Sequence, residues 1–260
     1  MELGFDKKVF LVTGGSRGIG KEIVLELLKE GACVSTCSRH FKDLKMLSEF
    51  LPDEYRDRFI FCECDIRDVH SIEKVAKMCV EKWGTVDGLV INAGYGIRGG
   101  VNELEKEDWM EQCELKLLGA INAINATRKY LKESSLGRIV VINGVTAITP
   151  DENMAAVSAA RAALRQVIRM YAKELIKDEI CVNAVNIGVI DTDRQRNKYE
   201  HSKTELSYEE WKRQEATVRK IPMKRFGEVH EVAPMVLFLL SSLASYITGG
   251  EIDIAGGMNV

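Results

Sequence analysis

Short apolar runs alternate with longer amphipathic stretches along almost the whole chain. The runs are rich in β-branched and aromatic residues and are bounded by glycine or polar residues, which is typical of strands buried in a parallel sheet. Six such strands are predicted, and a seventh returns to the sheet near the end of the chain. The ranges are 8–13, 32–37, 59–64, 88–91, 138–143, 180–186 and 246–254.

The segments between these strands have the spacing of helices that bury one face. Helices are predicted from the end of a first glycine-rich turn to residue 30, and at 41–57 with a loop, 69–83, 107–133, 151 or 152 to 177, and 228–241. Strands that alternate with helices predict a doubly wound parallel sheet in a three-layer α/β sandwich. We expect one Rossmann-like domain over residues 1–260, with ligands beyond the carboxyl ends of the strands.

Residues 191–220 interrupt this alternation with a strongly polar and charged segment. One interpretation is a lobe that covers the pocket mouth on the substrate side. The other is a solvated pair of helices with no ligand role, and the sequence leaves both open.

Composition excludes several classes of function. The 260 residues carry a formal net charge of −3 with mixed signs, which argues against nucleic-acid or polybasic membrane binding. No apolar run reaches the roughly 20 residues of a membrane span, and the N-terminus lacks a signal-peptide layout. A cytoplasmic protein is expected. Its seven cysteines predict free thiols in a reducing compartment, and no metal site is expected from their spacing.

The first strand runs into the glycine-rich turn Thr13-Gly14-Gly15-Ser16-Arg17-Gly18-Ile19-Gly20, and a helix follows. Glycines at 14, 18 and 20 allow a tight turn and a close approach to a pyrophosphate, which would face the helix N-terminus. At the end of the second strand, Ser38-Arg39 stands where an acidic residue would bind a ribose diol. Arginine instead suits a 2′-phosphate, and Arg17 adds a second charge. This favours NADP(H) over NAD(H), the alternative being two solvated surface arginines.

Two further candidates lie at strand ends. Asp65-Ile66 follows the third strand, where an adenine ring would rest, and Asn92-Ala93-Gly94 follows the fourth. A plain turn at the end of the strand is the structural alternative for the second.

With these motifs the chain resembles a short-chain dehydrogenase/reductase over essentially its whole length, in particular the 3-oxoacyl-carrier-protein-reductase-like branch. Later stretches add to the resemblance, namely Arg138–Ile142, Val182–Asn186 and Tyr246–Gly250. The resemblance implies a nicotinamide cofactor and a homo-oligomer, usually a tetramer or else a dimer. Motifs and resemblance together give the expected cofactor-binding residues Gly14, Ser16, Arg17, Gly18, Ile19, Gly20, Ser38, Arg39, Asp65, Ile66, Asn92, Ala93, Gly94, Arg161, Ile190 and Thr192.

Members of this family ordinarily use an Asn-Ser-Tyr-Lys tetrad. The resemblance places Lys116 at the asparagine, Gly144 at the serine, Val157 at the tyrosine and Arg161 at the lysine. Glycine and valine have no proton to donate, and arginine stays charged, although it can still reach a ribose hydroxyl. Loss of a positioned general acid typically costs about 10²–10⁴ in rate. Tyr95 or Tyr199 is a weaker candidate for a replacement acid.

Three hypotheses follow for the function. The first is an NADP(H)-binding protein without tetrad chemistry, acting as a cofactor-binding module or as the partner subunit of an active homologue. The second is an enzyme with altered chemistry, a reductase, dehydratase, isomerase or cyclase. The third is a structural oligomer without a ligand. For the second, the polar candidates are Lys116, Asn143, Thr146, Asp151, Tyr95 and Tyr199.

Overall fold

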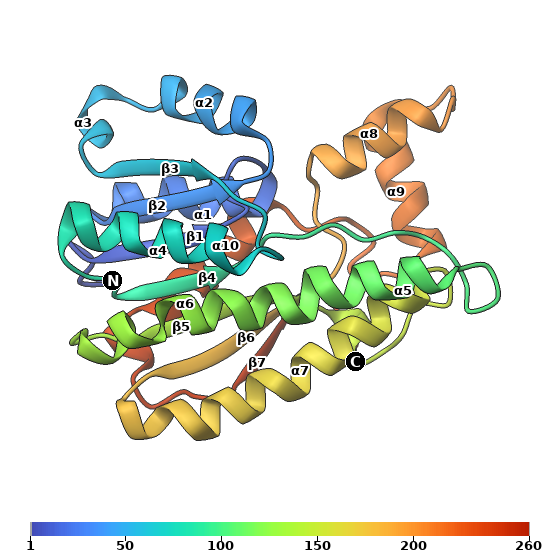
Figure 1. Ribbon diagram of the computed structural model, residues 1–260. Helices are drawn as coiled ribbons and strands as arrows, with labels where there is room; N and C mark the ends of the chain where they lie inside the picture. The colour runs from blue at the N-terminus through green and yellow to red at the C-terminus, as the bar shows by residue number, and fades with distance from the viewer. Residues whose placement is uncertain (1, 260) are drawn as a thin grey trace.

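Seven parallel strands form one sheet in the order β3-β2-β1-β4-β5-β6-β7, as seen in a computed structural model that describes residues 2–259 (Figure 1). The prediction of a doubly wound parallel sheet is therefore confirmed. The strand order reverses between β1 and β4, which is where such sheets bind ligands. The strands are β1 Val9–Thr13, β2 Cys33–Ser38, β3 Phe59–Glu63, β4 Gly88–Ile91, β5 Arg138–Gly144, β6 Cys181–Ile187 and β7 Glu251–Ile254.

Helices cover both faces of the sheet. Alternate residues of β1 face opposite sides, so that Val9 and Leu11 join one apolar layer while Phe10 and Val12 join the other. The first layer packs under α4, α6 and α7, and the second under α1 and α10. The helices are α1 Gly18–Lys29, α2 Phe41–Phe50, α3 Asp53–Arg56, α4 Val69–Trp83, α5 Lys106–Cys113, α6 Gly119–Glu133, α7 Ala155–Leu175, α8 Asp193–His201, α9 Tyr208–Val218 and α10 Val229–Leu240.

Two predicted helices differ from the observed ones. The helix expected at 107–133 is continuous, but a π-helical turn, Glu114–Leu118, separates α5 from α6. The helix expected from Asp151 or Glu152 begins only at Ala155. The reason is local: Asp151 accepts a hydrogen bond from the Asn153 amide, and Met154 pairs with Gly99 in a β-bridge, so the residues before 155 cannot be helical.

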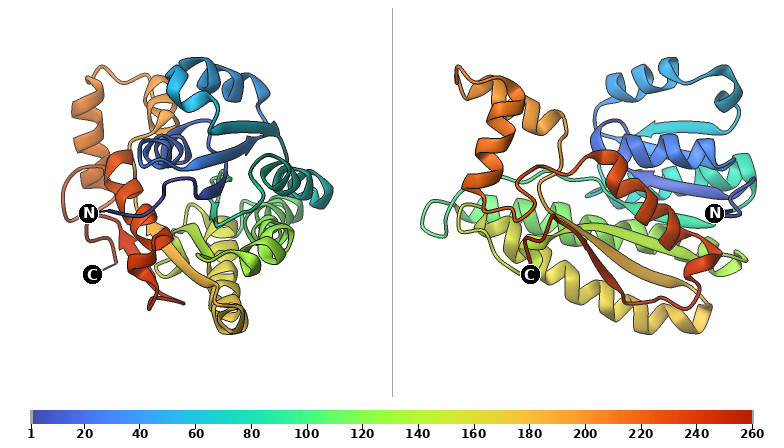
Figure 2. Two further views of the ribbon diagram at one scale, coloured as in Figure 1. Left: turned by 90° about the vertical axis from the view of Figure 1, so that its left-hand side faces the viewer. Right: turned by 180° about the vertical axis from the view of Figure 1, so that it is seen from behind.

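The polar segment 191–220 forms α8 and α9, which stand away from the sheet at the end where its strands finish (Figures 1 and 2). Apolar contacts within the segment and with Phe226, which follows it, hold it together. Tyr208 stacks on Trp211 with ring centroids 5.9 Å apart, and Trp211 meets Phe226 edge-on. The segment is therefore an appendage of the single sheet rather than an extension of it.

Within residues 2–259 no helix is both long and apolar enough to cross a bilayer. The same residues contain no group of three His, Cys, Asp or Glu side chains arranged to hold a metal ion. All seven cysteines are free thiols, and most of them are buried in the core.

Candidate functional site

A cavity of about 450 Å³ opens beyond the carboxyl ends of the strands, at the reversal of strand order. Most of the predicted cofactor-binding residues line it. They are Gly14, Ser16, Arg17, Gly18, Ile19, Ser38, Arg39, Asp65, Ile66, Asn92, Ala93, Gly94, Arg161 and Thr192. A volume of this order is ordinary for a small-molecule site. We call this cavity the pocket.

The glycine-rich turn is packed against the residues that follow β4. A Cβ atom on Gly14 would lie 2.7 Å from the Cα of Ala93, and one on Gly20 would lie 2.3 Å from the Gly14 carbonyl oxygen. The Asn92 side chain donates hydrogen bonds to the carbonyl oxygens of Thr13 and Gly14. Gly20 does not line the pocket; its missing side chain allows α1 to pack closely against the turn.

The first turn of α1 supplies a place for a negative group. The helix begins at Gly18, and Arg17 before it makes no side-chain cap. Main-chain N–H groups at a helix start have no intrahelical partner, so they favour an anion such as a pyrophosphate. Thr192 approaches the same turn, with its methyl group 3.4 Å from the position of a Cβ on Gly18.

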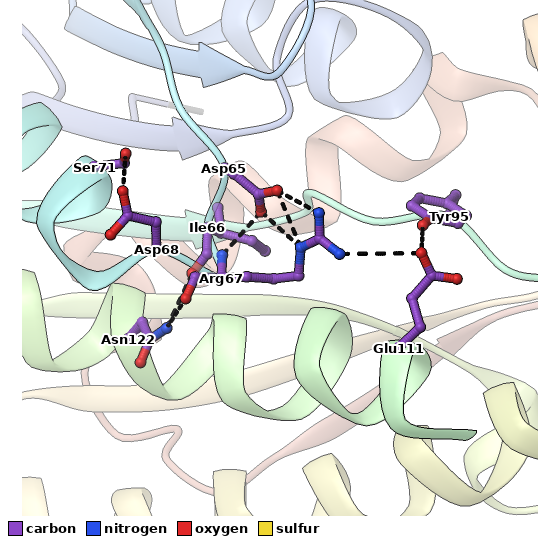
Figure 3. A network of polar contacts seen from close by, with 8 residues as sticks. All are labelled: Asp65, Ile66, Arg67, Asp68, Ser71, Tyr95, Glu111 and Asn122. Carbon is purple, nitrogen blue, oxygen red and sulfur yellow. Dashed lines mark hydrogen bonds and ion pairs between the residues drawn. The ribbon is translucent and has the colours of Figure 1, made fainter. Parts of the chain in front are cut away.

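A polar network holds in place the end of the pocket beside Arg39 and Asp65, which we call the outer end (Figure 3). The Arg67 guanidinium is paired with Asp65 at 2.5 Å and lies 4.0 Å from Glu111 of α5. Glu111 in turn accepts a hydrogen bond from the Tyr95 hydroxyl, and the Arg39 guanidinium lies 5.0 Å from the centre of the Tyr95 ring. Side chains from three separate segments thus support Arg39.

The ionisable groups in this network are held in defined states. The hydrogen bond from Arg67 lowers the pKa of Asp65, which keeps the carboxylate charged. The hydrogen bond to Glu111 raises the pKa of Tyr95, which keeps its hydroxyl protonated. Tyr95 is therefore a weaker acid than usual and its proton is directed at Glu111, so the structure does not support it as the replacement acid.

The opposite end of the pocket, which we call the inner end, carries the basic side chains of Arg161 and Lys116. The Arg161 guanidinium fills the space beside Gly144: a Cβ on that glycine would lie only 1.6 Å from Nη1 of the arginine. The same Nη1 is 3.4 Å from the hydroxyl of Thr146. Burial, and then the charge of Arg194, lower the pKa of Arg161 to about 10, so it remains a cation at neutral pH.

Lys116 lies on the π-helical turn and lines the pocket near Arg161. Its Nζ is 3.3 Å from the position that a Cβ on Gly94 would take. Loss of solvation, followed by the charges of Arg161 and Arg194, lowers the pKa of Lys116 well below its ordinary value. π-helical turns inside α-helices frequently occur at functional sites.

One buried acceptor on the pocket lining has no partner. Asn143 is 1% exposed; its Nδ2 donates to the Arg161 carbonyl oxygen at 3.3 Å, whereas its Oδ1 accepts no hydrogen bond within residues 2–259. A buried acceptor without a donor is costly, so this atom suits a ligand hydroxyl or amide. With the glycine turn, the α1 N-terminus and the two outer arginines, the lining fits a dinucleotide.

Other predicted candidates lie outside the pocket. Val157 is buried against Gly96, and Ile190 is buried and pairs with Gly227 in a β-bridge. The suggestion that Tyr199 replaces the acid is wrong, because its hydroxyl donates to the Leu206 carbonyl oxygen inside the α8–α9 appendage.

The sequence-based analysis missed several residues that shape the site. Asn122 of α6 donates to the carbonyl oxygens of Ile66 and Arg67 and so fixes the chain where it leaves β3. Arg194 of α8 lines the pocket and donates to the Gly96 carbonyl oxygen at 3.1 Å. Its place two residues after Thr192 was the available signal. The partners of Glu111 and Asn122 are far away in sequence, and no motif marks them.

A doubly wound sheet whose glycine turn lines a pocket at the switch point defines the class of Rossmann-type dinucleotide folds. The family model described as enoyl-(acyl carrier protein) reductase matches residues 14–259. The 3-oxoacyl-[acyl-carrier-protein] reductase FabG of Aquifex aeolicus is 34% identical over 99% of this chain and 100% of its own length. The FabG of Thermotoga maritima is 32% identical over 96% and 97%. The chain belongs to the short-chain dehydrogenase/reductase family.

Solved structures of related oxidoreductases superpose on this chain over almost its whole length. A short-chain oxidoreductase from Pseudomonas aeruginosa, described as containing an atypical catalytic center, superposes in its NADPH-bound form with a TM-score of 0.90. It is 32% identical and covers 97% of this chain and 98% of its own. L-sorbose reductase from Gluconobacter frateurii, complexed with NADPH and L-sorbose, gives a TM-score of 0.93 at 27% identity, with 99% and 98% covered.

Proposed function

We propose that this protein binds NADP(H) in the pocket and does not perform the tetrad-type carbonyl reduction of its family. The observation that carries the proposal is the contrast between the two ends of the pocket. The outer end has the glycine turn, the start of α1 and two arginines. At the inner end, the Arg161 guanidinium occupies the space that a side chain at residue 144 would need, and Val157 is buried outside the lining.

The choice of NADP(H) rests on Arg17 and Arg39 at the exposed outer rim. Neither is paired with a carboxylate of residues 2–259 within 4.0 Å, so both are available to a 2′-phosphate. The NADPH-bound P. aeruginosa relative and the NADPH complex of L-sorbose reductase support the same choice.

Calorimetric titration of the cofactor-free protein with NADPH and NADH tests this proposal. We expect NADPH to bind at least about tenfold more tightly, a difference of about 1.4 kcal/mol. Arg39→Gln should weaken NADPH and leave NADH nearly unchanged, while Lys42→Gln, an exposed charge outside the pocket lining, should change neither. Equal binding of both cofactors would refute the role of the arginines. Binding of neither would favour a structural protein without a dinucleotide.

The same preparation, saturated with NADPH, should be assayed against a broad panel of carbonyl compounds. When bound, the nicotinamide supplies or accepts a hydride. Without a positioned tyrosine the expected turnover is about 10²–10⁴ below that of a tetrad enzyme. Turnover at the rate of an ordinary family member would refute the non-catalytic part of the proposal. The protein would then be an active oxidoreductase.

A second candidate function is a divergent oxidoreductase, and Lys116 favours it. Burial, and then the charges of Arg161 and Arg194, lower the pKa of Lys116 well below its ordinary value, which makes its ammonium a better proton donor than that of an ordinary lysine. In this scheme the Lys116 ammonium would protonate the developing alkoxide while Arg161 orients the carbonyl oxygen. Lys116→Met would then abolish the residual turnover without changing the Kd of NADPH; loss of cofactor binding instead would mean a purely binding role.

The oligomeric state and the cellular location of the protein remain proposals. By resemblance to the family we expect a homo-oligomer, a tetramer or a dimer, or a hetero-oligomer with an active homologue. We also expect a cytoplasmic location. Light scattering of the purified protein, alone and mixed with an active family member, measures the first.

A further inference from the structure

Three basic side chains from three separate elements meet at the inner end of the pocket. Lys116 comes from the π-helical turn, Arg161 from the first half of α7, and Arg194, an exposed residue, from the start of α8. Within residues 2–259 no carboxylate lies within 4.0 Å of the nitrogen atoms of any of the three. We call them the three inner cations.

The acidic residues of the lining do not neutralise this group. Asp65 is bound to Arg67 at the outer end of the pocket, and Asp193 is exposed on the α8–α9 appendage. Burial, and then the charges of Arg161 and Arg194, lower the pKa of Lys116, and burial followed by the charge of Arg194 lowers the pKa of Arg161, as expected of like charges near one another without an anion between them. Bringing like charges together in a recess costs free energy unless a ligand repays it.

The cofactor accounts for only part of the positive charge. Its pyrophosphate belongs at the start of α1, and its 2′-phosphate belongs at Arg17 and Arg39, on the other side of the glycine turn. Neither group needs Lys116, which sits on a different element. A negative group on a second molecule would pair with the charges that the cofactor leaves unpaired.

We propose that the three inner cations bind the carboxylate of a small organic acid beside the cofactor. The inference rests on the proposed function, since it places the acid next to bound NADP(H). The planar Arg161 guanidinium matches a carboxylate with paired hydrogen bonds, Lys116 adds a point charge, and Arg194 closes the site from the appendage.

Two features favour a carboxylate over a phosphate. Lys116 and Arg161 lie inside helices rather than at their starts, and the one helix start near them, that of α8, already carries the carboxylate of Asp193 in its first turn. Arg194 is held in place by its hydrogen bond to the Gly96 carbonyl oxygen, so its guanidinium offers fewer free N–H groups than the three oxygens of a phosphate would use. A 3-oxoacyl thioester, by contrast, carries no charge beside its carbonyl group and would leave the three cations unpaired.

The test uses matched pairs of charged and uncharged probes. Acetate, pyruvate and levulinate, each beside its methyl ester, are titrated calorimetrically into the NADPH-saturated protein at low chloride. At least one acid should bind with a Kd below about 10 mM and at least tenfold more tightly than its ester. Lys116→Met, Arg161→Gln and Arg194→Gln should each weaken the acid at least tenfold. Lys173→Gln, an exposed charge farther along α7, should not.

Circular dichroism shows whether each variant folds. If Arg161→Gln does not fold, the test rests on Arg194→Gln and Lys116→Met. Binding of NADPH but of none of the acids overturns the inference and leaves the proposed function intact. Absence of NADPH binding overturns the proposed function, and titration of the cofactor-free protein then tests the cations alone. Phosphate or chloride binding as tightly as the acids overturns the assignment of a carboxylate.

Discussion

Arg161 and Gly144 form one packing unit rather than two independent changes. The resemblance to the family places them at its lysine and serine positions, which would suggest two separate replacements. The structure shows that the guanidinium lies where the first atom of any side chain at residue 144 would be, with Nη1 at 1.6 Å from that position. Glycine is therefore required next to this arginine, and restoring a serine at 144 alone would displace the guanidinium into the pocket.

Lys116 leads to a prediction about stability and pH. Its pKa is lowered in the folded protein, because of lost solvation and the charges of Arg161 and Arg194. Between that lowered pKa and the ordinary value of 10.5, the unfolded chain binds more protons than the folded protein. The charged lysine therefore destabilises the folded state fully below the lowered pKa, and this destabilisation disappears as the pH rises to 10.5. Lys116→Met should raise the free energy of unfolding by about 1–3 kcal/mol at pH 6.

Thermal unfolding from pH 6 to 10 in low-chloride buffer measures this effect. Each kcal/mol corresponds to about 2–4 °C in Tm for a chain of this size, and the gain should shrink steadily as the pH rises. A saturating carboxylic acid should reduce the gain, since it neutralises the charge only in the unsubstituted protein. A variant that is less stable than the parent at pH 6 would contradict this account.

At the scale of elements, the long helix formed by α5, the π-helical turn and α6 links the two ends of the pocket. It carries Glu111 at the outer end and Lys116 at the inner end. Tyr95 connects this helix to the cofactor side, because it donates to Glu111 and supports Arg39 with its ring.

The ring of Tyr95 should matter more than its hydroxyl for cofactor choice. A cation over an aromatic ring is worth about 0.5–2 kcal/mol, so Tyr95→Leu should weaken NADPH by roughly 2–30-fold. Tyr95→Phe keeps the ring and should stay close to the parent, while NADH should be little affected by either change. Calorimetry on the three proteins measures this. Equal losses for Phe and Leu would assign the effect to the hydroxyl instead.

At the scale of the whole molecule, the sequence was sufficient for the architecture. The first six strand ranges were correct within a residue or two, because apolar runs such as 88–91 are bounded by glycine and polar residues, whereas the seventh, expected at 246–254, begins only at Glu251. The outer end of the pocket was also predictable, since the glycine turn and Arg39 are close to their strand ends and need only local geometry.

The inner end was less predictable for physical reasons. The π-helical turn at Glu114–Leu118 leaves no pattern in the apolar spacing, and it determines where Lys116 points. Arg161 and Arg194 line the same pocket but come from elements that are distant in sequence. Tyr199 looked available as a single residue, but only the folded appendage shows that its hydroxyl is used by Leu206. Tertiary contacts, not local propensity, decided each case.

The whole scaffold leads to a last prediction: it should accept the tetrad if all four positions change together. Val157→Tyr alone should not give carbonyl reduction, since Arg161 still fills the space beside Gly144. The variant that combines Lys116→Asn, Gly144→Ser, Val157→Tyr and Arg161→Lys should raise NADPH-dependent reduction of the carbonyl panel by about 10²–10⁴, the usual contribution of a positioned acid. The same variant should lose the preference for acids over their esters, because two of the inner cations are altered. If it binds NADPH as tightly as the parent and still reduces nothing, the barrier lies in the pocket walls and the α8–α9 appendage rather than in the four side chains.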